Sequence, residues 1–220
     1  MLLTERNCRH DGWFLWHLPP YGGSSVRRVP MPIQSPQELL VHELHDIEDA
    51  ETQAAQALQK HMKEVQNDEL REMLEERLKQ GETLLEDVRQ CLQKLNGKSK
   101  GTRNSAARGL IEEAEKLAKE VKSPEMKQAV IIAGAQKLEH YCIAAWGTVK
   151  AIANEVGQQE LGEIMQRAVD EGYRWDEEMT RIAESRINPE AIESSVRSGK
   201  SQSSGKSSSR GDGQSEKRSR

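Results

Sequence analysis

The chain has 220 residues, of which 35% are hydrophobic and only 4% aromatic, and its formal net charge at pH 7 is −4. Together with a mean hydropathy of −0.80, this composition suits a helical domain rich in Ala and Leu better than a sheet protein. The sequence contains no run of about 18 apolar residues, so it predicts no membrane span. It also lacks a Gly-rich phosphate loop and a nucleophilic serine elbow, so nucleotide chemistry and acyl transfer have no support.

The first 30 residues follow neither a helical nor a strand period. Their one apolar run, Trp13 to Leu18, contains a histidine and is too short for a signal peptide. Met31 then opens a clean start for a domain. We therefore interpret residues 1–30 as a disordered leader or an over-extended start, and residues 31–193 as the folded domain.

A cap-and-proline signal marks the first helix. Ser35 supplies a hydroxyl cap, Pro36 takes the first helical position, and Glu38 follows three residues after the cap. The apolar period that follows predicts a helix over 36–66 and, after a short polar turn, a second over 69–95. Because so short a turn joins them, we expect these two helices to be antiparallel neighbours.

The next segment connects two helical pairs. A shorter amphipathic helix is predicted over 105–121, followed by long helices over 124–156 and 159–185. Asn188-Pro189 is expected to end the ordered region. The connection is long enough to cross the bundle, so the sequence predicts an all-α, ferritin-like four-helix bundle with a long helix-containing crossover.

The C-terminal residues 194–220 differ from the domain in charge. They hold seven Lys or Arg against Asp212 and Glu216 in a background of Ser and Gly, which gives about +5, whereas residues 31–193 carry about −11. Such composition is typical of a disordered tail. We interpret the tail as a solvated linker, with weak contact to nucleic acid through phosphate electrostatics as the alternative.

Cysteine usage fits a reducing compartment. The chain has three cysteines, Cys8, Cys91 and Cys142, with no Cys-x-x-Cys spacing. The last two lie on apolar helical faces. Small buried thiols in a cytoplasmic protein fit this pattern better than a disulfide framework does.

Three glutamates interrupt the apolar seams of three long helices. Read at alternating steps of three and four, each seam is apolar except at Glu51, Glu139 and Glu171. An ionised carboxylate buried without a partner is costly, so each of these needs a cation, a metal or a proton. The pattern is typical of a four-helix bundle that holds iron or manganese between carboxylates, with His140 and Asp176 close enough to be further candidate ligands.

The helix over 69–95 does not complete this ligand set. It has Gln80 and Leu84 at the level where a carboxylate and an imidazole are wanted. Arg77 lies nearer the inner side, and a guanidinium stays charged and binds carboxylates bidentately. Three interpretations stay open: an internal salt-bridge cluster with Arg77 or Lys137 as counter-charge, a bound metal, or misphased helices with exposed acids.

Three runs of sequence resemble a known family. They are His-Glu-Leu-His-Asp-Ile-Glu-Asp-Ala-Glu-Thr-Gln (42–53), Ala-Gln-Lys-Leu-Glu-His-Tyr-Cys-Ile-Ala-Ala-Trp-Gly-Thr (135–148) and Asp-Glu-Gly-Tyr-Arg-Trp-Asp-Glu-Glu-Met-Thr (170–180). Over about 31–186 the chain resembles the YciE/YciF-type ferritin-like proteins of unknown function, the DUF892 group. The resemblance implies a ferritin-like bundle, usually dimeric, in the bacterial cytoplasm and associated with stress.

The chain departs from the family's pattern at ligand positions. Where the family tends to have His-x-Glu-Glu-Thr, this chain has the run from Arg77 to Gly81, and Cys142 and Gly172 stand where the family has further acids. Two functions stay open. The first is a stress-associated protein with a partly degenerate carboxylate metal centre, or a di-iron or manganese protein of oxidative-stress defence, which the three glutamates favour. The second is a non-catalytic helical structural or stress protein that has lost metal binding, which the departures favour.

Overall fold

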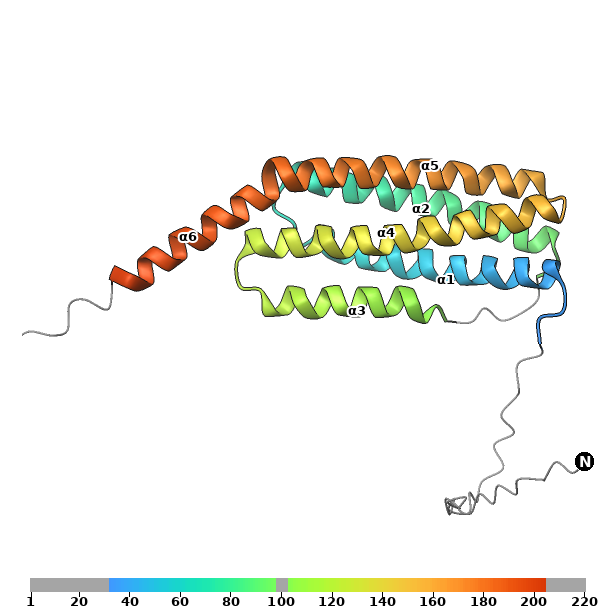
Figure 1. Ribbon diagram of the computed structural model, residues 1–220, viewed down its shortest axis with the longest axis horizontal. Coiled ribbons are helices and arrows are strands. Elements are labelled where there is room, and N and C mark those ends of the chain that lie inside the picture. The colour runs from blue at the N-terminus through green and yellow to red at the C-terminus, as the bar shows by residue number, and fades with distance from the viewer. Residues whose placement is uncertain (1–31, 98–102, 205–220) are drawn as a thin grey trace, which may run out of the picture. The chain divides into compact units, whose positions relative to one another are not determined.

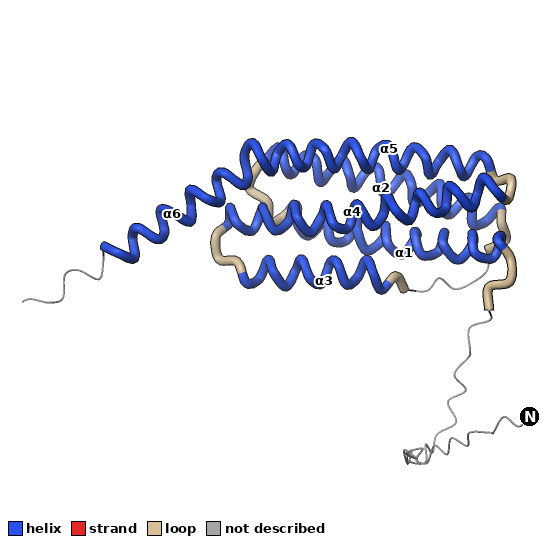
Figure 2. The backbone as a smooth tube through the Cα atoms, viewed as in Figure 1, coloured by secondary structure: helices blue, strands red, loops and turns tan. Residues whose placement is uncertain are grey.

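The computed structural model describes residues 32–97 and 103–204, and every regular element within them is a helix (Figure 1 and Figure 2). The all-α prediction is therefore confirmed. None of these helices combines the length and apolarity that crossing a membrane requires. The expectations for residues 1–30, and for the tail beyond residue 204, lie outside the described residues.

Four long helices form the bundle: α1 (Pro36–Met62), α2 (Asp68–Lys94), α4 (Pro124–Glu155) and α5 (Gln159–Ile182). Both α1 and α5 pack against α2 and α4, so the order around the bundle is α1, α2, α5, α4. The chain returns along the bundle through α3 (Ser105–Glu120), which lies against α1 and α4, so α2 and α4 run in the same direction (Figure 1). This is the predicted ferritin-like bundle with a helix-containing crossover.

The helices begin where their capping residues lie. Ser35 Oγ accepts a hydrogen bond from Glu38 N at 3.1 Å. Side-chain oxygens of Asn67, Asn104 and Ser123 likewise accept from a backbone N–H three residues later. These bonds satisfy N–H groups that have no partner within the helix. Local sequence therefore fixes where each of these four helices starts.

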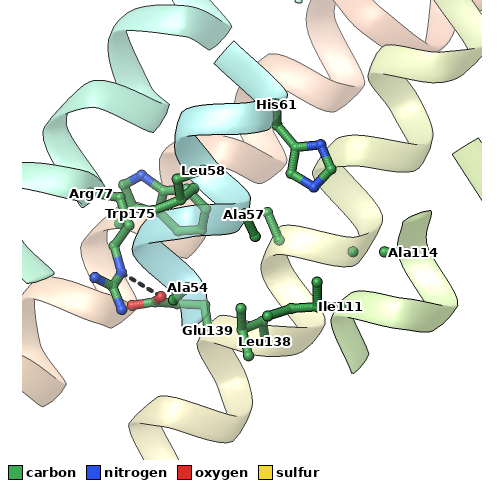
Figure 3. Close-up of a pocket in the computed structure, with 12 residues that line it drawn as sticks. Ala54, Ala57, Leu58, His61, Arg77, Ile111, Ala114, Leu138, Glu139 and Trp175 are labelled. Atoms are coloured by element: carbon green, nitrogen blue, oxygen red, sulfur yellow. Dashed lines mark hydrogen bonds and ion pairs between the residues drawn. The ribbon is translucent and has the colours of Figure 1, made fainter. Parts of the chain in front are cut away.

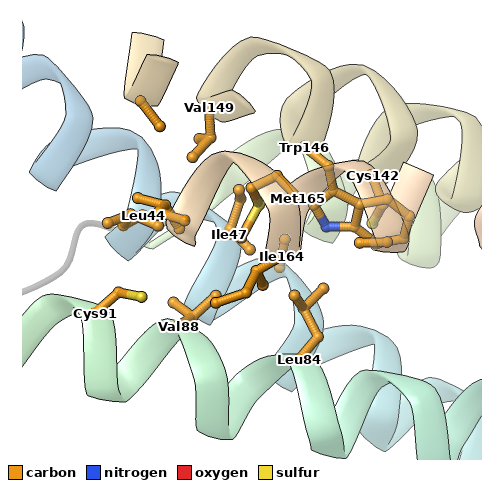
Figure 4. Close-up of a cluster of buried hydrophobic side chains, with 14 of the residues drawn as sticks. Leu44, Ile47, Leu84, Val88, Cys91, Cys142, Trp146, Val149, Ile164 and Met165 are labelled. Atoms are coloured by element: carbon orange, nitrogen blue, oxygen red, sulfur yellow. The ribbon is translucent and has the colours of Figure 1, made fainter. Parts of the chain in front are cut away.

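The apolar core has two parts along the bundle. One contains Leu44, Ile47, Val88, Trp146 and Met165 and lies towards the end where α4 joins α5 (Figure 4). The other lies towards the α1–α2 turn and contains Leu70, Leu74, Ile131, Met179 and Ile182. Arg77 of α2 and Gly172 of α5 lie between the two parts, whereas Glu139 of α4 lies within the first part. Polar groups thus enter the core near the boundary between its two parts.

The expected helix end at Asn188-Pro189 is wrong. Helix α5 passes into a π-helical turn, η1 (Ala183–Ile187), and continues as α6 (Asn188–Ser204). Proline lacks an N–H and its ring clashes with the carbonyl four residues earlier in a regular helix. A π turn immediately before the proline changes that hydrogen-bond spacing, so the helix continues.

Helix α6 is held to the bundle at its start. Ile187 and Ala191 are buried, with 0% and 3% of their surface exposed. Ser194 Oγ donates to Glu125 of α4 at 2.9 Å. Helix α6 therefore extends past the predicted domain boundary at 193, to residue 204.

Candidate metal centre

Glu51, Arg77 and Glu139 meet in the interior of the bundle. They come from α1, α2 and α4, and only 1%, 3% and 3% of their surfaces are exposed. Arg77 Nε donates to Glu139 Oε2 at 2.6 Å, a bond drawn in Figure 3. Arg77 Nη2 lies 3.1 Å from each carboxylate oxygen of Glu51. A single guanidinium therefore joins the two carboxylates.

Burial and charge pairing oppose each other in this cluster. Burial disfavours the charge on Arg77, but the carboxylates of Glu51 and Glu139 outweigh it, so the pKa of Arg77 is raised. Burial raises the pKa of Glu139, although Arg77 acts to lower it. Arg77 also lies over the ring of Trp146, 5.4 Å from its centroid, where the ring face attracts a cation. One fixed cation thus pairs with two carboxyl groups, and it offsets the charge of only one of them.

Two of the positions that depart from the family pattern pack directly on these carboxylates. The Cys142 thiol is 2% exposed and hydrogen-bonds Glu51, and burial raises its pKa well above the ordinary thiol value. It is therefore a neutral thiol and not a thiolate ligand. Gly172 faces Glu139, and a Cβ at Gly172 would lie 2.8 Å from Glu139 Oε1. The missing side chain is what lets α5 approach this carboxylate.

The prediction that Glu171 occupies the seam of its helix is wrong. Gly172 takes that place between Ala168 and Trp175, and Glu171 is half-buried. Positions 171 and 172 both agree with the helical spacing of three and four. The contacts with Glu139 and Trp146, however, leave room only for a glycine at the inner position. Within the described chain Glu171 makes no hydrogen bond or ion pair, and with Glu139 it lines a cavity of about 20 Å³.

The remaining candidates make no hydrogen bond or ion pair with the Arg77 cluster in the described part of the chain. The His140 side chain is 57% exposed and its Nε2 lies 3.2 Å from Asp176 at the surface. Lys137 pairs with Glu113 at 3.0 Å on the surface, so it is not the counter-charge. Leu84 is buried as an apolar side chain, whereas Gln80 is half-buried and lies beside Glu171 at the 20 Å³ cavity.

The donor set does not fit a metal ion. Arg77 nitrogens already bind both oxygens of Glu51 and one oxygen of Glu139. A divalent ion at this place would lie beside a fixed positive charge in a medium of low dielectric. Among the residues that the structure describes, no group of three or more His, Cys, Asp or Glu is placed to hold a metal ion. One carboxylate oxygen, Glu139 Oε1, is buried without a hydrogen-bond partner.

Sequence reasoning missed a second buried polar cluster, centred on Asn104. This residue is 2% exposed, and its side-chain nitrogen donates to Asp46 Oδ2 at 2.9 Å and to the Tyr141 hydroxyl at 2.6 Å. Its backbone N–H donates to Asp49 at 2.7 Å, and its side-chain oxygen caps α3. Only the helix cap could be predicted from neighbouring residues, because the other partners of Asn104 lie on α1 and α4, far away in sequence.

Residues 35–192 match the protein family described as "Domain of unknown function (DUF892)". The chain belongs to the DUF892 family. Protein YciF of Escherichia coli (strain K12) is 29% identical over 162 residues, which is 73% of this chain and 98% of that protein. The resemblance stated from the three sequence runs is therefore confirmed.

Solved structures agree with this assignment to DUF892. The crystal structure of the E. coli stress protein YciF matches with a TM-score of 0.66 and 29% identity, covering 71% of this chain and 99% of that one. YcfI, a putative structural protein from Rhodopseudomonas palustris, matches with a TM-score of 0.65 and 32% identity, covering 69% and 97%. A protein from Xanthomonas campestris pv. campestris, 19% identical with a TM-score of 0.61, covers 73% and 99% and supports the fold alone.

Proposed function

We propose that this DUF892 protein is a non-catalytic helical stress protein in which Arg77 takes the place of a metal ion between the core carboxylates. One observation carries the proposal: a single buried guanidinium lies 2.6 Å from Glu139 and 3.1 Å from Glu51. The names of two similar proteins, a stress protein and a putative structural protein, agree with it.

In this proposal the ion pairs fix how three helices pack. Separating Arg77 from either carboxylate strands a buried charge, which is strongly destabilising. Packings in which α1, α2 and α4 slide past one another therefore cost more than the native one. The cluster then contributes to a single arrangement of the bundle and carries out no chemistry.

A metalloprotein of oxidative-stress defence is the second candidate, because Glu139 Oε1 is left without a partner. This oxygen faces Gly172, and Glu139 lines the 20 Å³ cavity with Gln80 and Glu171. In this alternative, Glu139 and Glu171 hold iron or manganese beside the Arg77 pair. The two candidates differ in whether Glu171 contributes to ion binding.

Thermal unfolding in the presence of Mn²⁺, and of Fe²⁺ without oxygen, tests the proposal. The proposal predicts that saturating metal leaves the melting temperature of the wild type and of Glu171→Gln equally unchanged. A ligand at about 100 times its dissociation constant stabilises by about 2.7 kcal/mol. A rise of several degrees that Glu171→Gln abolishes, and that the surface variant Glu163→Gln retains, would favour the metalloprotein instead.

We propose a cytoplasmic homodimer as the functional form. The support is the family resemblance, the exposed Tyr173, which is 51% exposed, and the free buried thiols Cys91 and Cys142. Tyr141 offers less surface to such an interface than Tyr173 does, because it is half-buried and its hydroxyl bonds Asn104. Light scattering at tens of micromolar tests the assembly: Tyr173→Asp should shift it towards monomer, and a monomer mass for the wild type contradicts it.

A further inference from the structure

A small cavity lies beneath the crossover helix α3, between α1 and α4, and Arg77 of α2 and Trp175 of α5 complete its lining (Figure 3). Its volume is about 30 Å³. One water needs about 10–15 Å³ of such space, so the cavity accommodates a molecule of about two heavy atoms. Five of its twelve lining residues are small and come from three helices, namely Ala54, Ala57, Ala114, Gly134 and Ala135.

Helix contact explains only part of this small-residue wall. A Cβ at Gly134 would lie 2.5 Å from the Cβ of Ala114, so the close approach of α3 and α4 requires a glycine there. That contact does not account for the open space beside it, which larger side chains at Ala57 or Ala135 would fill. Unfilled space forfeits dispersion contacts that a packed core would make.

His61 adds one unpartnered polar atom to the cavity wall. The residue is 8% exposed, and its buried Nδ1 has no hydrogen-bond partner among the residues that the structure describes. Burial lowers the pKa of His61, so the imidazole is neutral near pH 7 and holds no ion by charge. A buried polar atom without a partner is destabilising. A molecule that fills the space restores the missing dispersion contacts, and one that bonds this nitrogen also supplies the missing hydrogen bond.

We propose that this cavity binds a small uncharged molecule of about two heavy atoms, with an apolar body and one hydrogen-bonding group that pairs with His61 Nδ1. Water fits less well, because a buried water makes about three hydrogen bonds, and the only polar side chains besides His61 in the lining, Arg77 and Glu139, already bond each other. Helix α3 covers the site and fully buries only Ala107 and Ala118, so its local opening gives a route of entry. The inference does not depend on the role proposed for Arg77.

Methanol and xenon are the probes, because both are small and only methanol can hydrogen-bond. In the full chain labelled with ¹³C at alanine methyl groups, each should shift the Ala57 and Ala114 signals in a saturable way. The exposed Ala144 and Ala151 should stay unchanged. His61→Phe should weaken methanol binding by about three- to tenfold, the equivalent of one hydrogen bond, and leave xenon binding intact.

Filling the cavity provides the matched comparison. Ala114→Leu should abolish both shifts, whereas Gly109→Ala on the same helix, whose added Cβ meets no atom within 4 Å, should retain them. If Ala114→Leu does not fold, Ala57→Val serves instead. Shifts that do not saturate, that survive the filled cavity, or that occur with xenon alone overturn the proposal. So does a crystal structure in which ordered water fills the cavity in the presence of methanol.

Discussion

Two polar clusters in the described part of the chain satisfy their polar groups in different ways. Around Arg77, two carboxylates and a guanidinium are joined by charge, and one oxygen of Glu139 has no partner. Around Asn104, a neutral amide joins Asp46 and Tyr141 and also caps α3. The first cluster links helices of the bundle itself, and the second attaches the crossover to it.

The two clusters therefore differ in how much stability is lost when one of their groups is removed. A buried ion pair returns little net stability over apolar residues of the same shape, but removing one partner strands the other charge. Removing the neutral amide strands no counter-ion, and its partners Asp46 and Tyr141 are only half-buried, so the cost is that of hydrogen bonds to groups that water can partly reach. We therefore expect a substitution in the Arg77 cluster to lower the stability more than one in the Asn104 cluster.

Removing the guanidinium should have the largest effect. Arg77→Ala should lower the free energy of unfolding by about 3–5 kcal/mol, because Glu51 and Glu139 are left buried without a cation. Arg89→Ala is the control, since Arg89 pairs with Glu48 at 2.9 Å but its side chain is 49% exposed; it should cost less than about 1 kcal/mol. If urea denaturation gives the same loss of unfolding free energy for both variants, the buried pair is no more sensitive than the surface pair.

The Asn104 cluster should come next. Asn104→Ala should cost about 2 kcal/mol, because it removes both the helix cap and the bonds to α1 and α4. Asn67→Ala is the matched control, since Asn67 caps α2 through Leu70 N in the same way, and it should cost about 1 kcal/mol. If the two variants unfold at the same urea concentration, the long-range bonds of Asn104 contribute nothing.

The glycine that faces Glu139 should give a loss of similar size. Gly172→Ala places a Cβ 2.8 Å from Glu139 Oε1 and should cost about 1–3 kcal/mol through overpacking. Gly147→Ala on α4 meets nothing within 4 Å and should stabilise the helix by about 0.5–1 kcal/mol. Thermal melts that move in the same direction for both variants contradict the close approach of α5.

The pH dependence of stability should show the smallest effect. Burial raises the pKa of Glu139 in the folded protein above its ordinary value of 4.5. At pH values between 4.5 and the raised pKa, the folded chain therefore binds more protons than the unfolded chain. Stability from this group is complete below pH 4.5 and is lost as the pH rises through the raised pKa. The free energy of unfolding, measured for the wild type relative to Glu139→Gln, should fall over that interval; a constant difference contradicts the raised pKa.

Sequence pattern predicted the helical bundle because its signals are local. The caps at Ser35 and Asn67, the apolar seams and the length of the crossover each depend on a few neighbouring residues. The end of the last helix was mispredicted because the rule for Pro189 assumes a regular helix, and a π turn removes that assumption. Local rules thus fail where the helix geometry itself changes.

The candidate site was predicted in part for a similar reason. Spacing placed Glu51 and Glu139 in the seams and Arg77 near them. It could not choose between Glu171 and Gly172, because both fit the helical period and only contact with Glu139 decides. Nor could it find the bonds of Asn104, whose partners on α1 and α4 are distant in sequence.

Elemental analysis is the most direct test of the claim that Arg77 neutralises the core in place of a metal. The full chain would be purified without a polyhistidine tag or chelator from cells supplied with iron and manganese, dialysed, and its metal content measured per chain. The account predicts far less than one equivalent of either metal in the wild type. Stoichiometric iron or manganese that survives dialysis, and that is lost in Glu139→Gln, would contradict it.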